Sequence, residues 1–127
     1  MMVWPILEPE LGKQLSAGLG VCVGTRVPSD IDSLEGFVRV ARGPGSDDGL
    51  TDSPLVDVET FAPTEYAAAL LAERTRGVFL DLRGGRRLAG ILVDSVSTAT
   101  GPTALQYSPT ISRYVASYRL RYRPNFS

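Results

Sequence analysis

The stretch that decides the fold is "LVDVETFAPTEYAAALLAERTRGVFLDL", residues 55–82, in which the spacing of the apolar side chains changes abruptly. Up to Phe61, apolar and polar residues alternate, which is the period of a β-strand with one buried face. From Glu65 onward the apolar residues recur every three or four positions, as on one side of a helix. Pro63 and Thr64 supply a rigid first turn. The stretch therefore predicts a strand that runs directly into the main helix of the domain, with a core face made of Ala67, Ala68, Leu71, Val78, Phe79 and Leu82.

A second, shorter helix is predicted near the N-terminus, over residues 7–19. Its leucines at positions 7, 11, 15 and 19 form a narrow apolar stripe at helical spacing. Gly20 follows the last leucine, which suits the residue just past a helix end.

Alternating patterns predict the remaining strands. Residues 20–28, "GVCVGTRVP", and 36–42, "GFVRVAR", are expected to be antiparallel neighbours. Two more strands are expected in "RLAGILVDSVST", residues 87–98, and "ISRYVASYRLRYR", residues 111–123. Together these segments predict a single α+β domain over residues 1–127, with a mostly antiparallel β-sheet of about five strands and two α-helices packed on one face.

Composition excludes several classes of function. The chain has 127 residues, a net charge of −1 and no histidine, so catalysis by Ser-His-Asp or Cys-His groups and histidine-based metal sites are excluded. The single cysteine, Cys22, has apolar neighbours that predict a buried strand residue. No apolar run reaches the ~18 residues of a transmembrane helix. We expect a non-enzymatic protein made in a cytoplasm, with no cofactor, metal, membrane or small-molecule substrate.

Two carboxylates and a group of arginines are the candidate functional side chains. Asp57 and Glu59 stand two positions apart on a predicted strand, so both side chains point to one face. In the last strand one face carries tyrosines and the other carries Arg113, Arg119, Arg121 and Arg123. We interpret the tyrosines as packing on the helices. The charged residues are interpreted as a polar, ion-pairing face, acting either across the sheet or across a subunit boundary.

The stretch "GPGSDDGLTDSP", residues 43–54, is predicted to be an exposed, mobile loop because it has turn residues and no apolar periodicity. It fits either a long hairpin connection or a surface finger that becomes ordered against a partner. The residues assigned to partner contact are Gly45, Ser46, Asp47, Asp48, Gly49, Leu50, Thr51 and Asp52.

In its order of elements the sequence resembles the tail terminator, or tail completion, proteins of long-tailed bacteriophages. The segments that carry the resemblance are "GVCVGTRVP", "LVDVETFAPT" leading into the Ala/Leu helix, and the final tyrosine and arginine strand. The resemblance implies a homohexameric ring that caps the tail tube, stops its polymerisation and joins the tail to the head connector. It implies no catalytic residues.

The resemblance also implies a location in the virion, at the head-proximal end of the tail. The partners would be further copies of the chain, the tail tube protein and the connector or stopper, while DNA would pass through the ring lumen without specific recognition. Another connector protein, such as a stopper or adaptor, fits the same pattern. A nucleic-acid-binding module using the C-terminal arginines and an enzyme using Asp57 and Glu59 are the alternatives from other classes.

Overall fold

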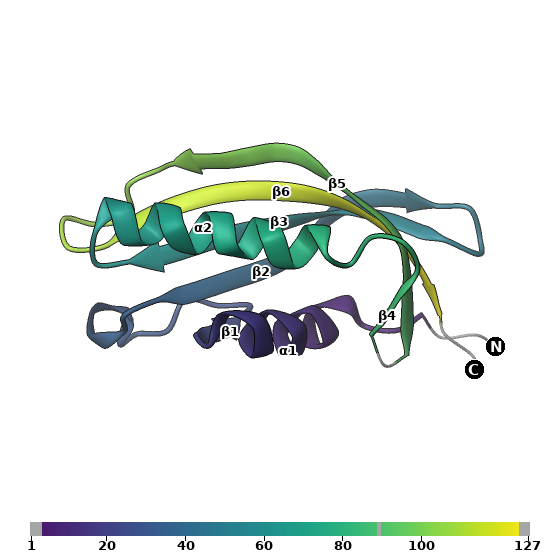
Figure 1. Ribbon diagram of the computed structural model, residues 1–127, viewed down its shortest axis with the longest axis horizontal. Coiled ribbons are helices and arrows are strands. Elements are labelled where there is room, and N and C mark those ends of the chain that lie inside the picture. The colour runs from purple at the N-terminus through teal and green to yellow at the C-terminus, as the bar shows by residue number, and fades with distance from the viewer. Residues whose placement is uncertain (1–3, 89, 125–127) are drawn as a thin grey trace.

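Two helices lie on one face of a curled six-stranded sheet in the computed structural model, which describes residues 4–88 and 90–124 (Figure 1). The elements, in chain order, are α1 (Leu7–Leu19), β1 (Cys22–Gly24), the short 3-10 helix η1 (Ile31–Ser33), β2 (Phe37–Asp47), β3 (Asp52–Ala62), α2 (Glu65–Leu80), β4 (Arg86–Leu88), β5 (Ile91–Ala104) and β6 (Ser112–Pro124).

The sheet has the strand order β1-β2-β3-β6-β5-β4 and is mixed in orientation. Every neighbouring pair is antiparallel except β1 and β2, which are parallel. The prediction of an α+β domain with two helices on one face is confirmed, whereas the antiparallel pairing of the first two strands is wrong. The connection over residues 25–36 carries the chain back to the start of β1, so β2 sets out beside it in the same direction.

The expected count of five strands is also wrong, because the segment 87–98 contributes to two strands. β4 ends at Leu88, and β5 begins at Ile91 and runs back along it. β5 then continues to Ala104, through residues that had the composition of a loop. Its pairing with β6 shifts register at several points, and these bulges accommodate Gly101 and Pro102, which a regular central ladder does not.

Helix α1 has the expected bounds and the expected buried stripe. Its leucines Leu7, Leu11, Leu15 and Leu19 are all buried. Gly20 adopts the left-handed conformation, with φ of 69°, and its N–H donates to the Ser16 carbonyl at 2.9 Å. A residue with a Cβ is strained in that conformation, so the glycine ends the helix.

Helix α2 begins at a side-chain cap. The Thr64 hydroxyl accepts a hydrogen bond from the Ala67 N–H at 3.1 Å, which satisfies one of the free donors of the first turn. The helix buries Leu71 and Phe79 against the sheet, and the Phe79 ring stacks on Tyr118 with ring centroids 4.4 Å apart. Ala67 and Val78, which were predicted to be in the core, are only partly buried.

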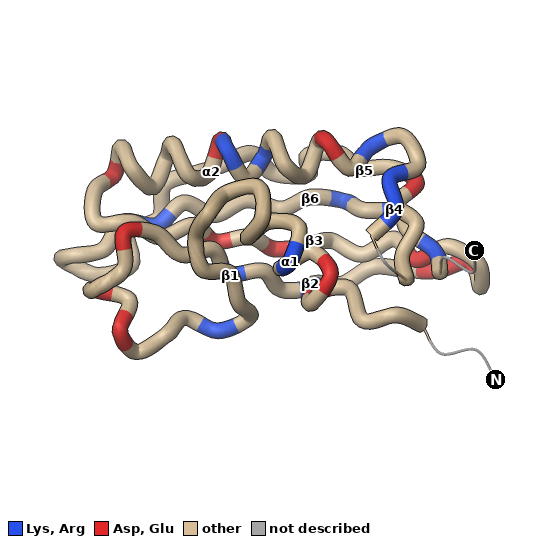
Figure 2. The backbone as a smooth tube through the Cα atoms, turned by 60° about the horizontal axis from the view of Figure 1, so that its bottom comes forward, with Lys and Arg blue, Asp and Glu red and all other residues tan. Residues whose placement is uncertain are grey.

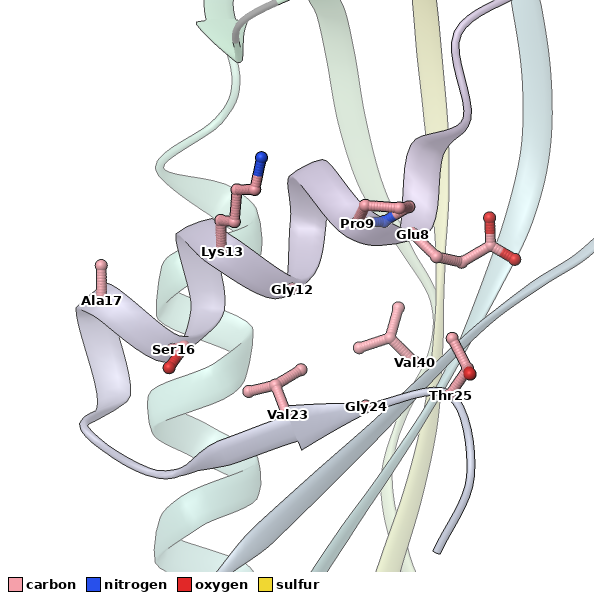
Figure 3. Close-up of a pocket in the computed structure, with 10 residues that line it drawn as sticks. All are labelled: Glu8, Pro9, Gly12, Lys13, Ser16, Ala17, Val23, Gly24, Thr25 and Val40. Carbon is pink, nitrogen blue, oxygen red and sulfur yellow. The ribbon is translucent and has the colours of Figure 1, made fainter.

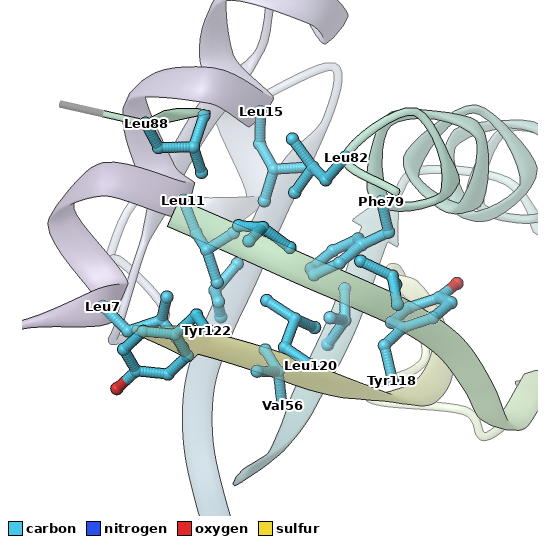
Figure 4. Close-up of a cluster of buried hydrophobic side chains, with 14 of the residues drawn as sticks. Leu7, Leu11, Leu15, Val56, Phe79, Leu82, Leu88, Tyr118, Leu120 and Tyr122 are labelled. Carbon is cyan, nitrogen blue, oxygen red and sulfur yellow. The ribbon is translucent and has the colours of Figure 1, made fainter. Parts of the chain in front are cut away.

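The main core lies between the two helices and the sheet (Figure 4). β6 contributes Tyr118, Leu120 and Tyr122, each with no exposed surface, so the prediction that its tyrosine face packs on the helices is confirmed. Burying one such large side chain contributes about 1.5 to 3 kcal/mol. Tyr114, at the start of the same face, is only partly buried.

A second, smaller cluster covers one end of the opposite sheet face. It consists of Ile31, Phe37, Phe61 and Ile111. The Tyr107 ring meets Phe61 edge-on, with centroids 5.1 Å apart. Cys22, predicted to be buried, is exposed, because β1 lies at the edge of the sheet.

Candidate subunit-contact face

The sheet face turned away from both helices, which we call the open face, carries the charged residues that the sequence singled out. Strand pairing places Glu59 between Arg39 and Val115, and Asp57 beside Ser117. The charges differ in sign from strand to strand, since the charged residues of β3 are all acidic and those of the neighbouring β6 are all arginines (Figure 2). All the residues predicted to make subunit contacts belong to this face: Asp57, Glu59, Arg113, Arg119, Arg121 and Arg123.

Glu59 is held within its own chain by two arginines. Its Oε1 accepts a hydrogen bond from Arg39 Nη1 at 2.7 Å, and its Oε2 accepts one from Arg113 Nη1 at 2.9 Å. Both arginines are themselves fixed, since Arg39 Nε donates to the Thr25 carbonyl and Arg113 Nε donates to the Leu105 carbonyl. This carboxylate therefore links β2, β3 and β6 across the sheet, one of the two arrangements expected from the sequence.

Asp57 has a different environment, although it lies only two residues away on the same face. Its side chain is exposed and makes no hydrogen bond or ion pair with any residue in the described part of the chain. It lines a shallow hollow of about 400 Å³ together with Glu59, Arg113 and Ser117. A Cβ added at Gly43 would lie 3.2 Å from Asp57 Oδ2, so the carboxylate sits against the bulge in β2.

The arginines of β6 differ in whether they have a hydrogen-bond or ion-pair partner. Arg119 Nη1 donates to the Ser53 carbonyl at 2.8 Å, and Arg123 lies 3.4 Å from Asp94 Oδ1. Arg121 is exposed and forms no ion pair with a carboxylate of residues 4–88 or 90–124. The open face thus has one acidic and one basic group, Asp57 and Arg121, that form no salt bridge with the described residues, although the charge of Arg121 also lowers the pKa of Asp48.

The segment predicted to be an exposed loop is exposed at residues 44–50 but is mostly a β-hairpin, which agrees with the first of its two interpretations, a long hairpin connection. β2 continues to Asp47 and β3 starts at Asp52, with Asp47 paired to Asp52 and Ser46 to Ser53. We call residues 43–54 the arm; it projects from one end of the sheet (Figure 1). Gly and Asp suit a turn, yet here they also extend two strands, because each strand supplies the hydrogen bonds of the other.

The tip of the arm is closed by aspartate side chains. Asp48 Oδ1 accepts hydrogen bonds from the Thr51 N–H at 2.6 Å and the Leu50 N–H at 2.9 Å. These two backbone donors, Thr51 first, hold the pKa of the Asp48 carboxyl below its usual value. Gly49 takes the positive φ of the turn, and Leu50 is left largely exposed at the tip.

A polar cluster at the base of the arm, in which Tyr122 and Asp52 are buried and Arg42 is exposed, was not anticipated from the sequence. Tyr122 Oη donates to Asp52 Oδ2 at 3.0 Å and accepts from Arg42 Nη1 at 2.7 Å, while Arg42 Nη2 lies 2.6 Å from the same carboxylate oxygen. Burial, and then the hydrogen bond to Asp52, raise the pKa of Tyr122 to about 12. Tyr122 lies 80 positions from Arg42 and 70 from Asp52, so no local pattern could have linked it to them.

Clusters of metal ligands and membrane-spanning helices are not found among the described residues. Within 4–88 and 90–124 no three or more Cys, Asp or Glu side chains converge as metal ligands. No helix of that part of the chain has the length and apolar character needed to cross a bilayer. The described residues also offer three surfaces for contact: the open face, the arm and the edges of the sheet.

Comparisons with known proteins give a match in structure but not in sequence. No family model matches the chain, and no curated protein matches it. A solved chain from the "Virion of native gene transfer agent (GTA) particle" is similar, with a TM-score of 0.64 and 16% identity over 92% of this chain and 94% of that chain. A second solved chain has a TM-score of 0.50 and 14% identity over 94% and 91% of the two chains. These likenesses show a shared fold over nearly the whole length.

Proposed function

We propose that this chain is a structural protein of a phage-like virion. The observation that carries the proposal is the similarity in fold to a chain of a gene transfer agent virion, which extends over 92% of this chain and 94% of that one. The match spans both compared chains almost completely, so it concerns the whole described fold and not one part of it. The tail-terminator resemblance in the sequence supports the same class of protein.

Within that class, the role proposed is tail termination by a homo-oligomeric ring, hexameric by the resemblance. A closed ring needs a heterologous contact, in which each subunit offers two different and complementary patches. The open face supplies groups for such patches, since Asp57 and Arg121 have opposite charges and make no ion pair with the described residues of their own chain. Charge pairs of this kind favour one register between subunits over others.

The proposed partners are the tail tube protein on one side of the ring and the head connector or stopper on the other, with DNA passing through the lumen. The arm is the feature suited to such axial contacts, because it projects from the end of the sheet and exposes Leu50 and two aspartates at its tip. Since acidic groups repel phosphates, this tip fits a protein partner better than nucleic acid.

The experiment that tests the proposal combines a mass measurement with a binding assay. Purified chain is analysed by native mass spectrometry and sedimentation velocity, and then mixed with assembled tail tubes. We expect a single ring species that binds tube ends and blocks further elongation. A chain that stays monomeric at all concentrations and leaves tube growth unchanged contradicts the proposal.

The same fold similarity also fits a neighbouring connector protein, such as a stopper or adaptor, because the similar chain is described only as part of a virion. The binding assay separates the two roles. A terminator binds the tail tube and limits its length, whereas a stopper binds the head portal complex and leaves tube growth unaffected.

A further inference from the structure

The sheet has two free edges of very different length. β5 is paired on its outer side with β4 only at Ile91–Val93, so its outer edge is open from Asp94 to Ala104. At the opposite edge, β1 pairs with β2 through Cys22–Gly24, and its outer side is open. Outward-facing peptide groups on both edges can pair with another strand.

The long β5 edge lacks the charged residues that usually protect such an edge. Residues 95–104 contain no Asp, Glu, Lys or Arg and are mostly Ser, Thr and Ala. Pro102 and the register shifts interrupt the far end of this edge, whereas residues 95–98 have regular pairing and no inward charge, and are a template for strand addition. Residues 21–25, around β1, are likewise uncharged. Pairing these two edges therefore places no charged residue of either strand segment in the contact, and Glu8 and Lys13 of α1 stand beside the β1 edge.

The directions of the strands suit a contact between identical copies. Along the sheet β2, β3, β6 and β5 alternate in direction, and β1 runs parallel to β2. When a second copy stands beside the first in the same orientation, its β1 is therefore antiparallel to the β5 of the first. Rotation about a ring axis that follows the strands preserves this relation at every contact.

Beside the β1 edge there is space for the side chains of an added strand. A groove of about 740 Å³ lies between α1 and β1 (Figure 3). Its walls include Pro9, Gly12, Ala17, Val23 and Val40. The groove is on the helix side of the sheet, and a strand added to β1 would direct alternate side chains into it. Thr98 on β5 points to that side, because it is paired with Tyr118 of the core.

From these features we propose that β5 of one copy adds to β1 of the next, so that the sheet continues from subunit to subunit. The proposal rests on the ring of the proposed function and adds a contact between sheet edges to the contact proposed for the open face. The occupant of the β5 edge is thus a second copy of this chain, held by backbone hydrogen bonds between unlike edges.

The native cysteine provides a direct test. Cys22 is the only cysteine of the chain, is exposed, and lies on β1 with its side chain opposite to Val23, which packs on the core. On β5, Ser97, Thr100 and Thr103 share the open face with it, since they pair with Arg119, Ser117 and Val115. We would change each of the three to Cys separately, and use Thr98→Cys, which points to the helix side, as the matched control.

Any disulfide formed must join two copies. β1 and β5 are separated by β2, β3 and β6, which corresponds to about 19 Å along the sheet. A disulfide requires Cα atoms within about 7 Å. Each variant is oxidised in the assembled state and run on a non-reducing gel, beside the same variant carrying Cys22→Ser.

We expect a ladder of covalent oligomers for at least one face-matched variant, at least tenfold stronger than for Thr98→Cys and absent with Cys22→Ser. A ring that forms by native mass but gives no ladder overturns the edge pairing and leaves the proposed function standing. Cross-links that persist with Cys22→Ser also overturn it, since they would join two β5 edges. A chain that is monomeric under all conditions overturns both proposals.

Discussion

Tyr122 lies directly opposite Asp52 in the β3–β6 ladder, and its hydroxyl donates a 3.0 Å hydrogen bond to that carboxylate. Arg42 contacts both groups from β2. Three strands are thus joined by one polar cluster at the base of the arm, in which Tyr122 and Asp52 have almost no exposed surface while Arg42 is exposed. Since buried polar groups are costly when a partner is removed, the stability of the arm depends on this cluster.

Tyr122→Phe is expected to reduce the free energy of unfolding by about 1 to 3 kcal/mol, because the buried Asp52 carboxylate loses a hydrogen bond and Arg42 loses its contact with the hydroxyl. Urea denaturation followed by circular dichroism measures the change. Tyr114→Phe is the control, since Tyr114 is partly exposed and its hydroxyl makes no side-chain hydrogen bond within the described residues. Equal losses for the two variants would show that the cluster does not stabilise the fold.

The same tyrosine predicts a loss of stability in alkali. Its pKa is about 12 in the folded chain and about 10 when unfolded. Because the folded pKa is raised, the stabilisation is fully present below pH 10 and is lost as the pH rises toward 12. The loss amounts to roughly 2 to 3 kcal/mol. Burial also raises the pKa of Tyr118, so the Tyr122 contribution is the difference in pH dependence between wild type and Tyr122→Phe.

Leu71→Ala is expected to cost about 2 to 5 kcal/mol, because the side chain is 5% exposed and its removal leaves a cavity beneath α2. Leu70→Ala is a matched control on the same helix, since Leu70 is 48% exposed and should change stability by no more than about 0.5 kcal/mol. Denaturant titration of both variants checks the helix face. A smaller loss for Leu71 than for Leu70 would mean that the face is assigned wrongly.

Glu59 and Asp57 are expected to respond differently to loss of charge. Glu59→Gln leaves Arg39 and Arg113 facing each other without their shared carboxylate, and should lower the stability of the monomer by about 1 to 3 kcal/mol. Asp57→Asn should leave monomer stability within about 0.5 kcal/mol, because the side chain is exposed. Thermal unfolding of the two variants side by side measures the contrast, and equal effects contradict it.

Charge reversal at Asp57 tests the open face as a subunit contact. Asp57→Arg should weaken ring formation while the monomer stays folded, since it places like charges across the proposed contact. Arg121→Glu should restore part of the assembly in the double variant if Arg121 is the partner. Native mass spectrometry of the single and double variants gives the result. Normal assembly of Asp57→Arg would place the subunit contact elsewhere.

Shortening the arm tests its proposed role in binding the tail tube. A deletion of residues 45–52, the stretch assigned to partner contact, would also remove Asp52, which is buried and bonded to Tyr122 at the base of the arm. Replacing residues 48–51 with Asn-Gly keeps the Asp47–Asp52 pair and closes the hairpin with a two-residue turn. We expect an unchanged fold and ring mass with weaker binding to tube ends, measured by co-sedimentation. Unchanged binding would exclude the tip as the contact.

The partners and directions of the edge strands could not be predicted from local sequence patterns. Residues 20–28 and 36–42 were predicted to pair antiparallel, but their strands are parallel. Residues 91–104 form a strand of their own, which pairs with β4. Alternation indicates a strand but not its partner or direction, since both depend on how distant segments meet. The hairpin of the arm was only one of two interpretations for the same reason, because its Gly and Asp residues pair with one another across a turn.

The sequence by itself determined the two helices, the β3 strand that leads into α2, and the face of β6 that is buried, because each depends on the spacing of apolar residues within one segment. Which charged side chains have a partner could be seen only from the tertiary structure. Glu59 is bound by two arginines while Asp57 is left free, and Asp52 meets Tyr122 across 70 positions of the chain. The physical reason is that a charged side chain is paired by whatever strand the fold places beside it, and that neighbour is set by contacts far apart in the sequence.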